Sequence, residues 1–467
     1  MLNNVRMKLF LAILILMVSM AVIKIIKDQN TTMEREEIMI TYTTVTHGYD
    51  WGPAVDQIVL SFGAHVDPST VKPEHFIVEV TSSNQTAKRK ITGAYISDAS
   101  GNAADKGSHV TLTLEVGPTV YESSPFNYDF MSGQNQYKEM NYALSLTPES
   151  TLATASGEHI SWTPETSIEK TADLMPYSDL FAHNQDFKLG EVSLKYASYT
   201  PKPHDSANSD DKIPLIIWLH GAGEGGTDTT IAVLGNNVTN LVQDKIQSRF
   251  GEQGAYVLVP QAPTMWMDVN GQNVYNISVK DSDGKSYYED ALMALIEQFV
   301  SDHPDIDTDR ILIGGCSNGG YMTVKMIIDY PDYFAAAYPA AMAYASDWLN
   351  EDRLNALMDM PIWLTHAQND PTVKISEDVK DANGAYIPVD NFSNALYDRL
   401  VQKGHKNIHY SLFENVVDMS GNYVTLDGKP FEYNGHWSWI YTLNDDCTEV
   451  IEGTETTLFQ WLAMQKK

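Results

Sequence analysis

Cysteine and basic residues are both scarce in this chain of 467 residues. Only two cysteines occur, Cys316 and Cys447, which excludes a disulfide-rich scaffold and a zinc site built from four cysteines. Lysine and arginine number 31 against 61 aspartates and glutamates, giving a formal net charge of −30. A field of that sign repels phosphate backbones, so we expect no nucleic acid as a partner.

Long hydrophobic runs are also missing, apart from one near the N-terminus. That run extends from Leu9 to Ile23 and follows the basic residues Arg6 and Lys8, which is typical of an export signal. Small residues near position 20 offer a cleavage site, yet counting on to Ile26 gives a stretch just able to span a bilayer. Residues 1–27 therefore predict an extracellular or cell-surface protein, either secreted after cleavage or anchored in the membrane.

Residues 37–176 consist of short alternating runs separated by turn residues. Apolar and polar side chains alternate in Gln57–Phe62, Phe76–Val80 and Val110–Val116. Because successive side chains of a strand point to opposite faces, this period indicates strands with one buried face. Roughly seven such runs without an amphipathic helix predict a small all-β sandwich of the immunoglobulin kind.

From 177 to 467 strands alternate with helices. Near-continuous apolar runs such as Ile216–Leu219 are typical of parallel strands buried on both faces, so the pattern predicts a doubly wound, mostly parallel α/β sheet. The expected strands are Val192–Tyr199, Leu215–Leu219, Tyr256–Pro260, Arg310–Ile313, Phe334–Tyr338, Ile362–Thr365 and His409–Phe413. The expected helices include Tyr288–Asp302, Gly320–Ile328 and Asp347–Met358.

A serine flanked by glycines follows one of these strands. Gly315 and Gly319 lie two residues either side of Ser317, between the strand at 310–313 and a helical stretch. Such glycines allow a tight turn that exposes the serine hydroxyl, and the helix N-terminus favours negative charge at a reacting carbonyl. The pattern alone arises by chance in about one chain of this length in ten, but its place between strand and helix favours a nucleophile.

The base and the acid are inferred from the edge of the sheet on which they lie. Active sites of doubly wound sheets lie beyond the C-terminal ends of the strands. His405 and His409 come before or at the start of the last strand, whereas His436 lies in a loop beyond it. Asp370 leaves the C-terminal end of the strand at 362–365, where it can accept the Nδ1 proton of His436.

A glycine-rich loop follows the buried strand at 215–219. Its backbone N–H groups, together with that of Asn318, would form an oxyanion hole, with Ala222 as the main donor and Gly223 as the alternative. A phosphate-binding loop would need a Lys-Ser/Thr end, which is missing here.

Aromatic residues near these motifs suggest the walls of a pocket. Trp266 follows the strand at 256–260 and Trp437 follows His436; both suit a small apolar or aromatic acyl group, with ordinary core packing as the equal alternative. The carboxylates at 305, 307 and 309 are spaced like calcium ligands but lack the glycine and the distal glutamate. We expect no metal and no cofactor.

These motifs, in this order, resemble the α/β-hydrolase superfamily, whose triads run Ser, Asp, His along the chain. The segments 220–224, 260–263, 315–320 and 435–439 are similar to those of prolyl-oligopeptidase-like and polyhydroxybutyrate-depolymerase-like serine esterases. With its β-rich front, the chain resembles bacterial secreted esterases that carry an N-terminal immunoglobulin-like domain. The resemblance implies a front domain that supports homo-oligomers and shapes the active-site mouth. It also implies a bridge between Cys316 and Cys447, as in some feruloyl esterases, with two buried free thiols as the alternative.

These inferences predict a serine carboxylesterase that hydrolyses small short-chain or feruloyl-type esters through an acyl-enzyme. Little chain separates the strands at 334–338 and 362–365, which argues against a lipase with a large lid. One alternative is a prolyl-oligopeptidase-like peptidase, although no propeller repeat is found. Another is a surface protein whose sandwich binds a partner and whose hydrolase is inert; the complete set of triad residues argues against it.

Overall fold

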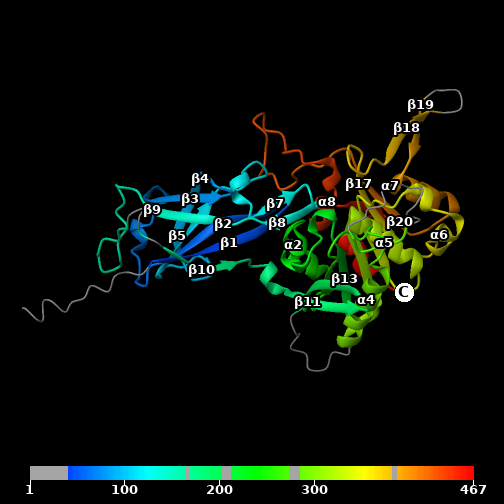
Figure 1. Ribbon diagram of the computed structural model, residues 1–467, viewed down its shortest axis with the longest axis horizontal. Helices are drawn as coiled ribbons and strands as arrows, with labels where there is room; N and C mark the ends of the chain where they lie inside the picture. The colour runs from blue at the N-terminus through cyan, green and yellow to red at the C-terminus, as the bar shows by residue number, and fades with distance from the viewer. Residues whose placement is uncertain (1–39, 163–165, 167, 202–211, 273–283, 381–385) are drawn as a thin grey trace, which may run out of the picture.

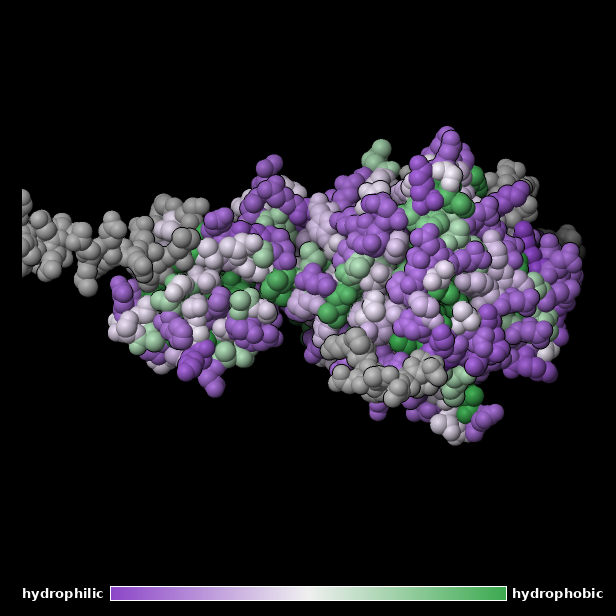
Figure 2. Space-filling model, turned by 90° about the horizontal axis from the view of Figure 1, so that it is seen from below, coloured by the Kyte–Doolittle hydropathy of each residue, from purple (hydrophilic) through white to green (hydrophobic). Residues whose placement is uncertain are grey.

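A computed structural model describes most of the chain. The described residues are 40–162, 166, 168–201, 212–272, 284–380 and 386–467. The expected export segment, residues 1–27, lies outside them. Within the part that the structure describes, no helix has the length and apolar character needed to cross a membrane. Figure 1 shows a β-rich N-terminal part beside a larger α/β part, and in Figure 2 these form two lobes of unequal size joined at a narrower waist.

The N-terminal part is a β-sandwich, which confirms the predicted class. Its larger sheet has the order β10-β1-β2-β6-β5 and its smaller sheet the order β4-β3-β9. The strands are β1 (Thr41–Tyr49), β2 (Gly52–Ser61), β3 (Phe76–Ser82), β4 (Gln85–Arg89), β5 (Ile91–Ser97), β6 (His109–Leu114), β9 (Asn141–Leu146) and β10 (Glu169–Leu174). Alternate residues such as Ile58, Leu60 and Val110 meet Val78 and Trp162 in the buried layer between the sheets, because side chains of a strand alternate faces.

A two-stranded hairpin leaves the sandwich and reaches the α/β part. It consists of β7 (Phe126–Asp129) and β8 (Gln134–Tyr137), and Figure 1 shows it between the two parts of the molecule. The Gln134 side chain donates from Nε2 to the carbonyl oxygen of Pro263 at 3.0 Å. The hairpin was not predicted as a separate element.

The α/β part is built on an eight-stranded sheet with the order β11-β12-β14-β13-β15-β16-β17-β20. Its strands are β11 (Ala182–Leu189), β12 (Val192–Tyr199), β13 (Ile213–Leu219), β14 (Tyr256–Gln261), β15 (Ile306–Cys316), β16 (Ala336–Ala340), β17 (Ile362–Ala367) and β20 (Ile408–Phe413). The β11–β12 and β12–β14 pairs are antiparallel, and the other neighbouring pairs are parallel. The predicted mostly parallel α/β class is therefore confirmed.

Helices cover both faces of this sheet, each burying an apolar layer against it. They are α2 (Thr229–Leu234), α3 (Asp244–Gln247), α4 (Glu289–Asp302), α5 (Asn318–Asp329), α6 (Glu351–Ala356), α7 (Phe392–Lys403), α8 (Trp439–Leu443) and α9 (Leu458–Met464). The expected helix 347–358 is shorter than predicted. A 3₁₀ turn (Ser346–Trp348) comes first, and the Asn350 side chain caps α6 by accepting from the N–H of Arg353.

Two small antiparallel hairpins complete the α/β part. They are formed by β18 (Ser376–Lys380) with β19 (Tyr386–Asp390), and by β21 (Thr448–Ile451) with β22 (Thr454–Thr457). Both lie outside the main sheet. Because β13, β15, β16 and β17 are parallel, they end at one common edge of the main sheet, and the loops that follow them can meet there.

Candidate active site

Ser317 lies in the tight turn between β15 and α5. Its backbone has φ 52° and ψ −111°, a conformation that a residue with a side chain adopts only under strain. A Cβ added to Gly315 would lie 2.5 Å from the carbonyl oxygen of Leu219, and one added to Gly319 would lie 2.0 Å from the same atom. The turn presses directly against the backbone at the end of β13. Both positions therefore require glycine.

The structure brings Ser317, His436 and Asp370 together in one hydrogen-bonded chain. His436 Nε2 lies 2.9 Å from Ser317 Oγ, and His436 Nδ1 lies 2.8 Å from Asp370 Oδ2. His436 is held in a 3₁₀ turn (Gly435–Trp437), where the Asn434 side chain accepts from its backbone N–H at 2.9 Å. The Trp439 ring packs edge-on against the imidazole, with centroids 5.3 Å apart. The ring can therefore exchange a proton with Ser317 without reorienting.

Asp370 is buried and surrounded by N–H donors. Oδ1 accepts from the backbone N–H groups of Thr372 and Val373, each at 2.8 Å. Oδ2 faces His436 and, at 3.0 Å, the Nε2 of a second histidine, His366. Burial alone would raise the pKa of Asp370, but the hydrogen bonds from the two histidines and from Val373 together hold the pKa well below its usual range. The carboxylate is therefore ionised at neutral pH.

His366 is a member of the site that sequence reasoning missed. It is fully buried, and its Nε2 lies 3.0 Å from both Asp370 Oδ2 and the carbonyl oxygen of Val373. Its Nδ1 lies 2.7 Å from the hydroxyl of Ser393. Since Nε2 faces two acceptors, it carries the proton, and the Ser393 hydroxyl donates to Nδ1. The available signal was its place at the end of β17, four residues before Asp370.

The proposed oxyanion donors lie at the ends of two adjacent strands. Leu219 at the end of β13 is in register with Gly315 of β15, and a 3₁₀ turn (Ala222–Glu224) follows β13. The N–H groups of Ala222, Gly223 and Asn318 have no hydrogen-bond acceptor among the residues that the structure describes. These donors are therefore available to a ligand beside Ser317.

His220 supports this loop from the core. Its Nδ1 donates to the carbonyl oxygen of Gly221 at 2.6 Å, and its Nε2 accepts from the N–H of Ala262 at 3.1 Å. Complete burial lowers the pKa of His220 to about 4, so the ring stays neutral and keeps this arrangement. These contacts place His220 behind the loop as a support, and none of them reaches the triad.

Comparison with known proteins identifies both halves of the chain. Residues 41–161 match the family described as the esterase Ig-like N-terminal domain, and residues 206–410 match the phospholipase/carboxylesterase family. The chain thus combines an esterase-type Ig-like domain with a domain of the phospholipase/carboxylesterase family. A thermostable esterase of known structure has the same fold, with a TM-score of 0.70 and 24% identity over 91% of this chain and all of that one.

Two further matches cover less of the chain. A secreted protein of Arthroderma benhamiae, whose function is uncharacterised, is 27% identical over 266 residues, which cover 53% of this chain. The match spans only 25% of the length of that curated relative. A ferulic acid esterase matches 49% of this chain and 88% of its own, at 13% identity and a TM-score of 0.34; a likeness this weak carries no argument about substrate.

The two tryptophans expected in the pocket wall differ in position. Trp266 is fully buried, packing between His220 and Tyr288, so it belongs to the core and its expected place in an open wall is corrected. Trp437 is half-buried beside Tyr433 and remains a candidate. Sequence reasoning missed Tyr128 on β7, whose ring would lie 3.6 Å from a Cβ added to Gly223, at the oxyanion loop.

The two cysteines, Cys316 and Cys447, are free and buried. Asn236 donates from Nδ2 to the sulfur of Cys316 at 3.4 Å, while the sulfur of Cys447 lies 3.4 Å from the Thr365 hydroxyl. Burial raises the pKa of Cys447 to about 12 and that of Cys316 well above its usual range. The structure thus shows two neutral thiols in place of the bridge that the resemblance implied.

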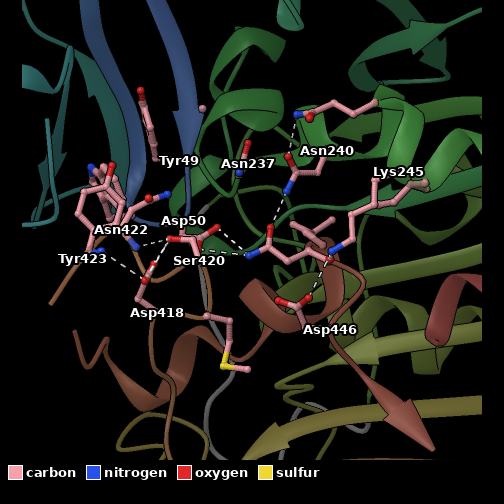
Figure 3. Close-up of a pocket in the computed structure, with 17 residues that line it drawn as sticks. Tyr49, Asp50, Asn237, Asn240, Lys245, Asp418, Ser420, Asn422, Tyr423 and Asp446 are labelled. Atoms are coloured by element: carbon pink, nitrogen blue, oxygen red, sulfur yellow. Dashed lines mark hydrogen bonds and ion pairs between the residues drawn. The ribbon is translucent and has the colours of Figure 1, made fainter. Parts of the chain in front are cut away.

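A separate cavity lies at the junction of the two domains (Figure 3). Its volume is about 540 Å³, and its lining includes Tyr49, Asp50, Asn237, Asp418 and Tyr423 but none of the triad residues. Burial raises the pKa of Asp50 to about 6, although its hydrogen bonds partly oppose this. The cavity is a polar seam between the two domains and contributes no group to the triad. Among the described residues, no group of three or more His, Cys, Asp or Glu side chains is placed to hold a metal ion.

Proposed function

We propose that this chain is a serine carboxylesterase in which Ser317 is the nucleophile, His436 the general base and Asp370 the residue that orients the base. The observation that carries the proposal is the continuous hydrogen-bonded chain from Ser317 Oγ through His436 to Asp370. Among the described residues, the N–H groups of Ala222, Gly223 and Asn318 have no acceptor, and they follow the ends of the adjacent strands β13 and β15. A nucleophile, its base and anion donors at one edge of a sheet are the parts that acyl transfer needs.

The first half of the reaction acylates the enzyme. His436 Nε2 takes the proton of Ser317 Oγ, which attacks the ester carbonyl and forms a C–O bond. The carbonyl oxygen becomes an oxyanion that the N–H groups of Ala222 and Asn318 stabilise, with Gly223 as the alternative donor. Asp370 stabilises the imidazolium and keeps its own charge. Collapse of the intermediate breaks the bond to the alcohol oxygen, which leaves with the proton from His436.

Water completes the cycle. His436, neutral again, takes a proton from water while the hydroxyl adds to the acyl carbon. The second tetrahedral intermediate expels Ser317 Oγ, which recovers its proton from His436, and the carboxylic acid departs. Each half of the reaction returns His436 to the neutral form in which it began, so the proton balance closes without a cofactor.

Small esters, short-chain or aromatic, are the proposed substrates. Between β16 and β17 the chain forms only a 3₁₀ turn and the six-residue α6, too little for a large lid over a long acyl chain. Trp437 and Tyr128 offer aromatic surface near the triad and the oxyanion loop. Export is also part of the proposal, because residues 1–27 have the pattern of an export signal and one relative is described as secreted. Two points stay predictions: whether residues 1–27 are cleaved or anchor the protein in the membrane, and whether the sandwich domain supports homo-oligomers.

The test is hydrolysis of a p-nitrophenyl acyl series from two to twelve carbons, with methyl ferulate and a prolyl-amide alongside. We expect turnover of short acyl chains or of ferulate that disappears in Ser317→Ala, together with fluorophosphonate labelling of the wild type alone. Circular dichroism of the variant shows whether its fold is retained. Prolyl-amide cleavage without ester turnover would refute the substrate class, and a folded Ser317→Ala variant with full activity would refute the nucleophile.

A further inference from the structure

Glu224 is a buried carboxylate at the end of the oxyanion loop that the mechanism above does not use. Its residue is 6% exposed. Its two oxygens accept from neutral amides, Oε1 from Asn135 Nδ2 at 3.0 Å and Oε2 from Asn236 Nδ2 at 2.8 Å. No Lys, Arg or His among the described residues forms an ion pair with it. A buried charge held only by neutral donors is unfavourable for stability, which points to another role for it.

The carboxylate closes the oxyanion turn from the inside. The backbone N–H groups of Gly221 and of Glu224 itself also stabilise its charged form, and a Cβ added to Gly221 would lie 3.0 Å from Oε2. The N–H of Glu224 itself donates to the carbonyl oxygen of Gly221 at 3.4 Å, which closes the turn. The N–H groups of Ala222 and Gly223 are left without an acceptor among the described residues. The carboxylate thus packs against the turn that carries these free N–H groups.

The same carboxylate connects the turn to the segment that carries the nucleophile. Asn236, which donates to Glu224 Oε2, also donates to the sulfur of Cys316, the residue before Ser317. A Cβ added to Gly221 would lie 3.4 Å from that sulfur. Glu224 and Asn236 therefore connect the oxyanion turn with the Ser317 turn, in addition to the direct packing of Gly315 and Gly319 against Leu219.

The remaining contact comes from the other domain. Asn135 belongs to β8 of the hairpin that extends from the sandwich (Figure 1). Its side chain would lie 3.2 Å from a Cβ added to Gly223, so it packs directly on the turn that bears the free N–H groups. Without Asn135, Oε1 of a buried carboxylate would lose its side-chain donor.

We propose that Glu224 is a positioning residue for ester hydrolysis: its carboxylate, completed by Asn135 of the sandwich domain, fixes the oxyanion donors relative to Ser317. The inference rests on the function proposed above. It assigns the sandwich a part in the chemical step, through one side chain. Because oxyanion contacts strengthen in the transition state, loosening them lowers kcat more than it raises KM.

Glu224 can gain a proton near neutral pH, and this changes the contacts through which it positions the turn. Burial raises its pKa to about 7, although the bonds from Asn236, Gly221 and Asn135 oppose this. The titratable group that faces it is the Cys316 thiol, which burial and the Glu224 charge keep neutral. A protonated Glu224 offers fewer acceptor sites to the N–H groups around it. Glutamine has the same shape but resembles the protonated acid at every pH.

The test compares Glu224→Gln and Asn135→Ala with two controls on the same hairpin. Asn127→Ala changes an exposed residue of β7, and Gln134→Ala removes the bond between the domains to Pro263 but leaves both side-chain amides that donate to Glu224. Steady-state kinetics on the best p-nitrophenyl ester give kcat and KM, and a trifluoromethyl ketone reports affinity for a tetrahedral adduct. Thermal unfolding identifies any variant that fails to fold.

We expect kcat to fall about 10- to 100-fold in Glu224→Gln and less in Asn135→Ala, with KM nearly unchanged and ketone affinity reduced in parallel. Both controls should retain wild-type kcat. A folded Glu224→Gln variant with wild-type kcat would overturn the proposal, as would equal losses in Asn135→Ala and Gln134→Ala, which would indicate general domain packing. If Glu224→Gln fails to fold, Asn135→Ala decides alone. Absence of ester turnover in the wild type would instead refute the proposed function.

Discussion

Four N–H groups point at the carboxylate of Asp370, and an asparagine in its place could satisfy only two of them. Two come from the backbone of Thr372 and Val373, and two from the rings of His366 and His436. The amide nitrogen of asparagine is a donor, so it must face one of these pairs. If it faces the histidines, the proton of His436 moves to Nε2, where it blocks acceptance of the Ser317 proton.

The expected loss in Asp370→Asn follows from that tautomer. A general base locked in the wrong tautomer lowers kcat by about 10⁴-fold, equivalent to about 5 kcal/mol of transition-state stabilisation. KM should change little, because the pocket is intact. Unsatisfied donors cost about 1–3 kcal/mol each, so the melting temperature should also fall. A folded Asp370→Asn variant whose kcat stays within tenfold of wild type would refute this account of the triad.

The pH dependence of stability gives an independent check on Asp370. Its pKa in the folded protein lies well below the usual value, so the ionised form stabilises the fold. That contribution is fully present above the unfolded-state pKa of about 4 and is lost as the pH falls through the lower folded-state pKa. The difference in melting temperature between wild type and Asp370→Asn should therefore shrink as the pH falls below about 4. A difference in melting temperature that stays constant down to pH 2 would contradict this account of Asp370.

Three further substitutions are predicted in the same terms. His366→Ala removes one donor to Asp370, and we expect kcat to fall about tenfold with the loss of a charge-assisted bond; unchanged kcat would limit His366 to packing. Asp50→Asn should raise the melting temperature at pH 8 and leave it unchanged near pH 4. The reason is that the pKa of Asp50 is raised to about 6, so its ionisation destabilises the fold by at most about 3 kcal/mol as the pH rises. Equal changes in melting temperature at both pH values would refute this prediction. Gly319→Ala places a methyl 2.0 Å from the Leu219 carbonyl oxygen and should destabilise the fold by about 1–3 kcal/mol in thermal unfolding; a wild-type melting temperature would contradict that packing.

The main sheet could be predicted because its information is local. The bounds predicted for Val192–Tyr199 agree with β12, since the alternation that identifies the strand lies within the strand. Ser317, Asp370 and His436 could be selected because one topological rule places functional loops at the C-terminal edge of parallel strands. The structure brings these three within hydrogen-bond distance; their catalytic roles remain proposals.

Aromatic side chains show where such local rules fail. Trp266 and Trp437 were given the same role because each follows a motif of the site, yet one is fully buried and the other half-exposed. His220 and Tyr288 pack against Trp266, whereas part of Trp437 faces solvent. No periodicity in the neighbouring sequence carries that information.

Contacts between the domains are harder to predict from the sequence. Asn135 lies 89 residues before Glu224, in a stretch with no catalytic motif, and an isolated asparagine on a short strand is ordinary surface. Glu224 itself ends a glycine-rich loop in which sequence reasoning weighed only backbone donors. Its importance depends on being buried, and burial there results from the hairpin of another domain covering the turn. The proposed triad can thus be inferred within one domain, whereas the positioning role proposed for Glu224 also involves a side chain from the other domain, Asn135.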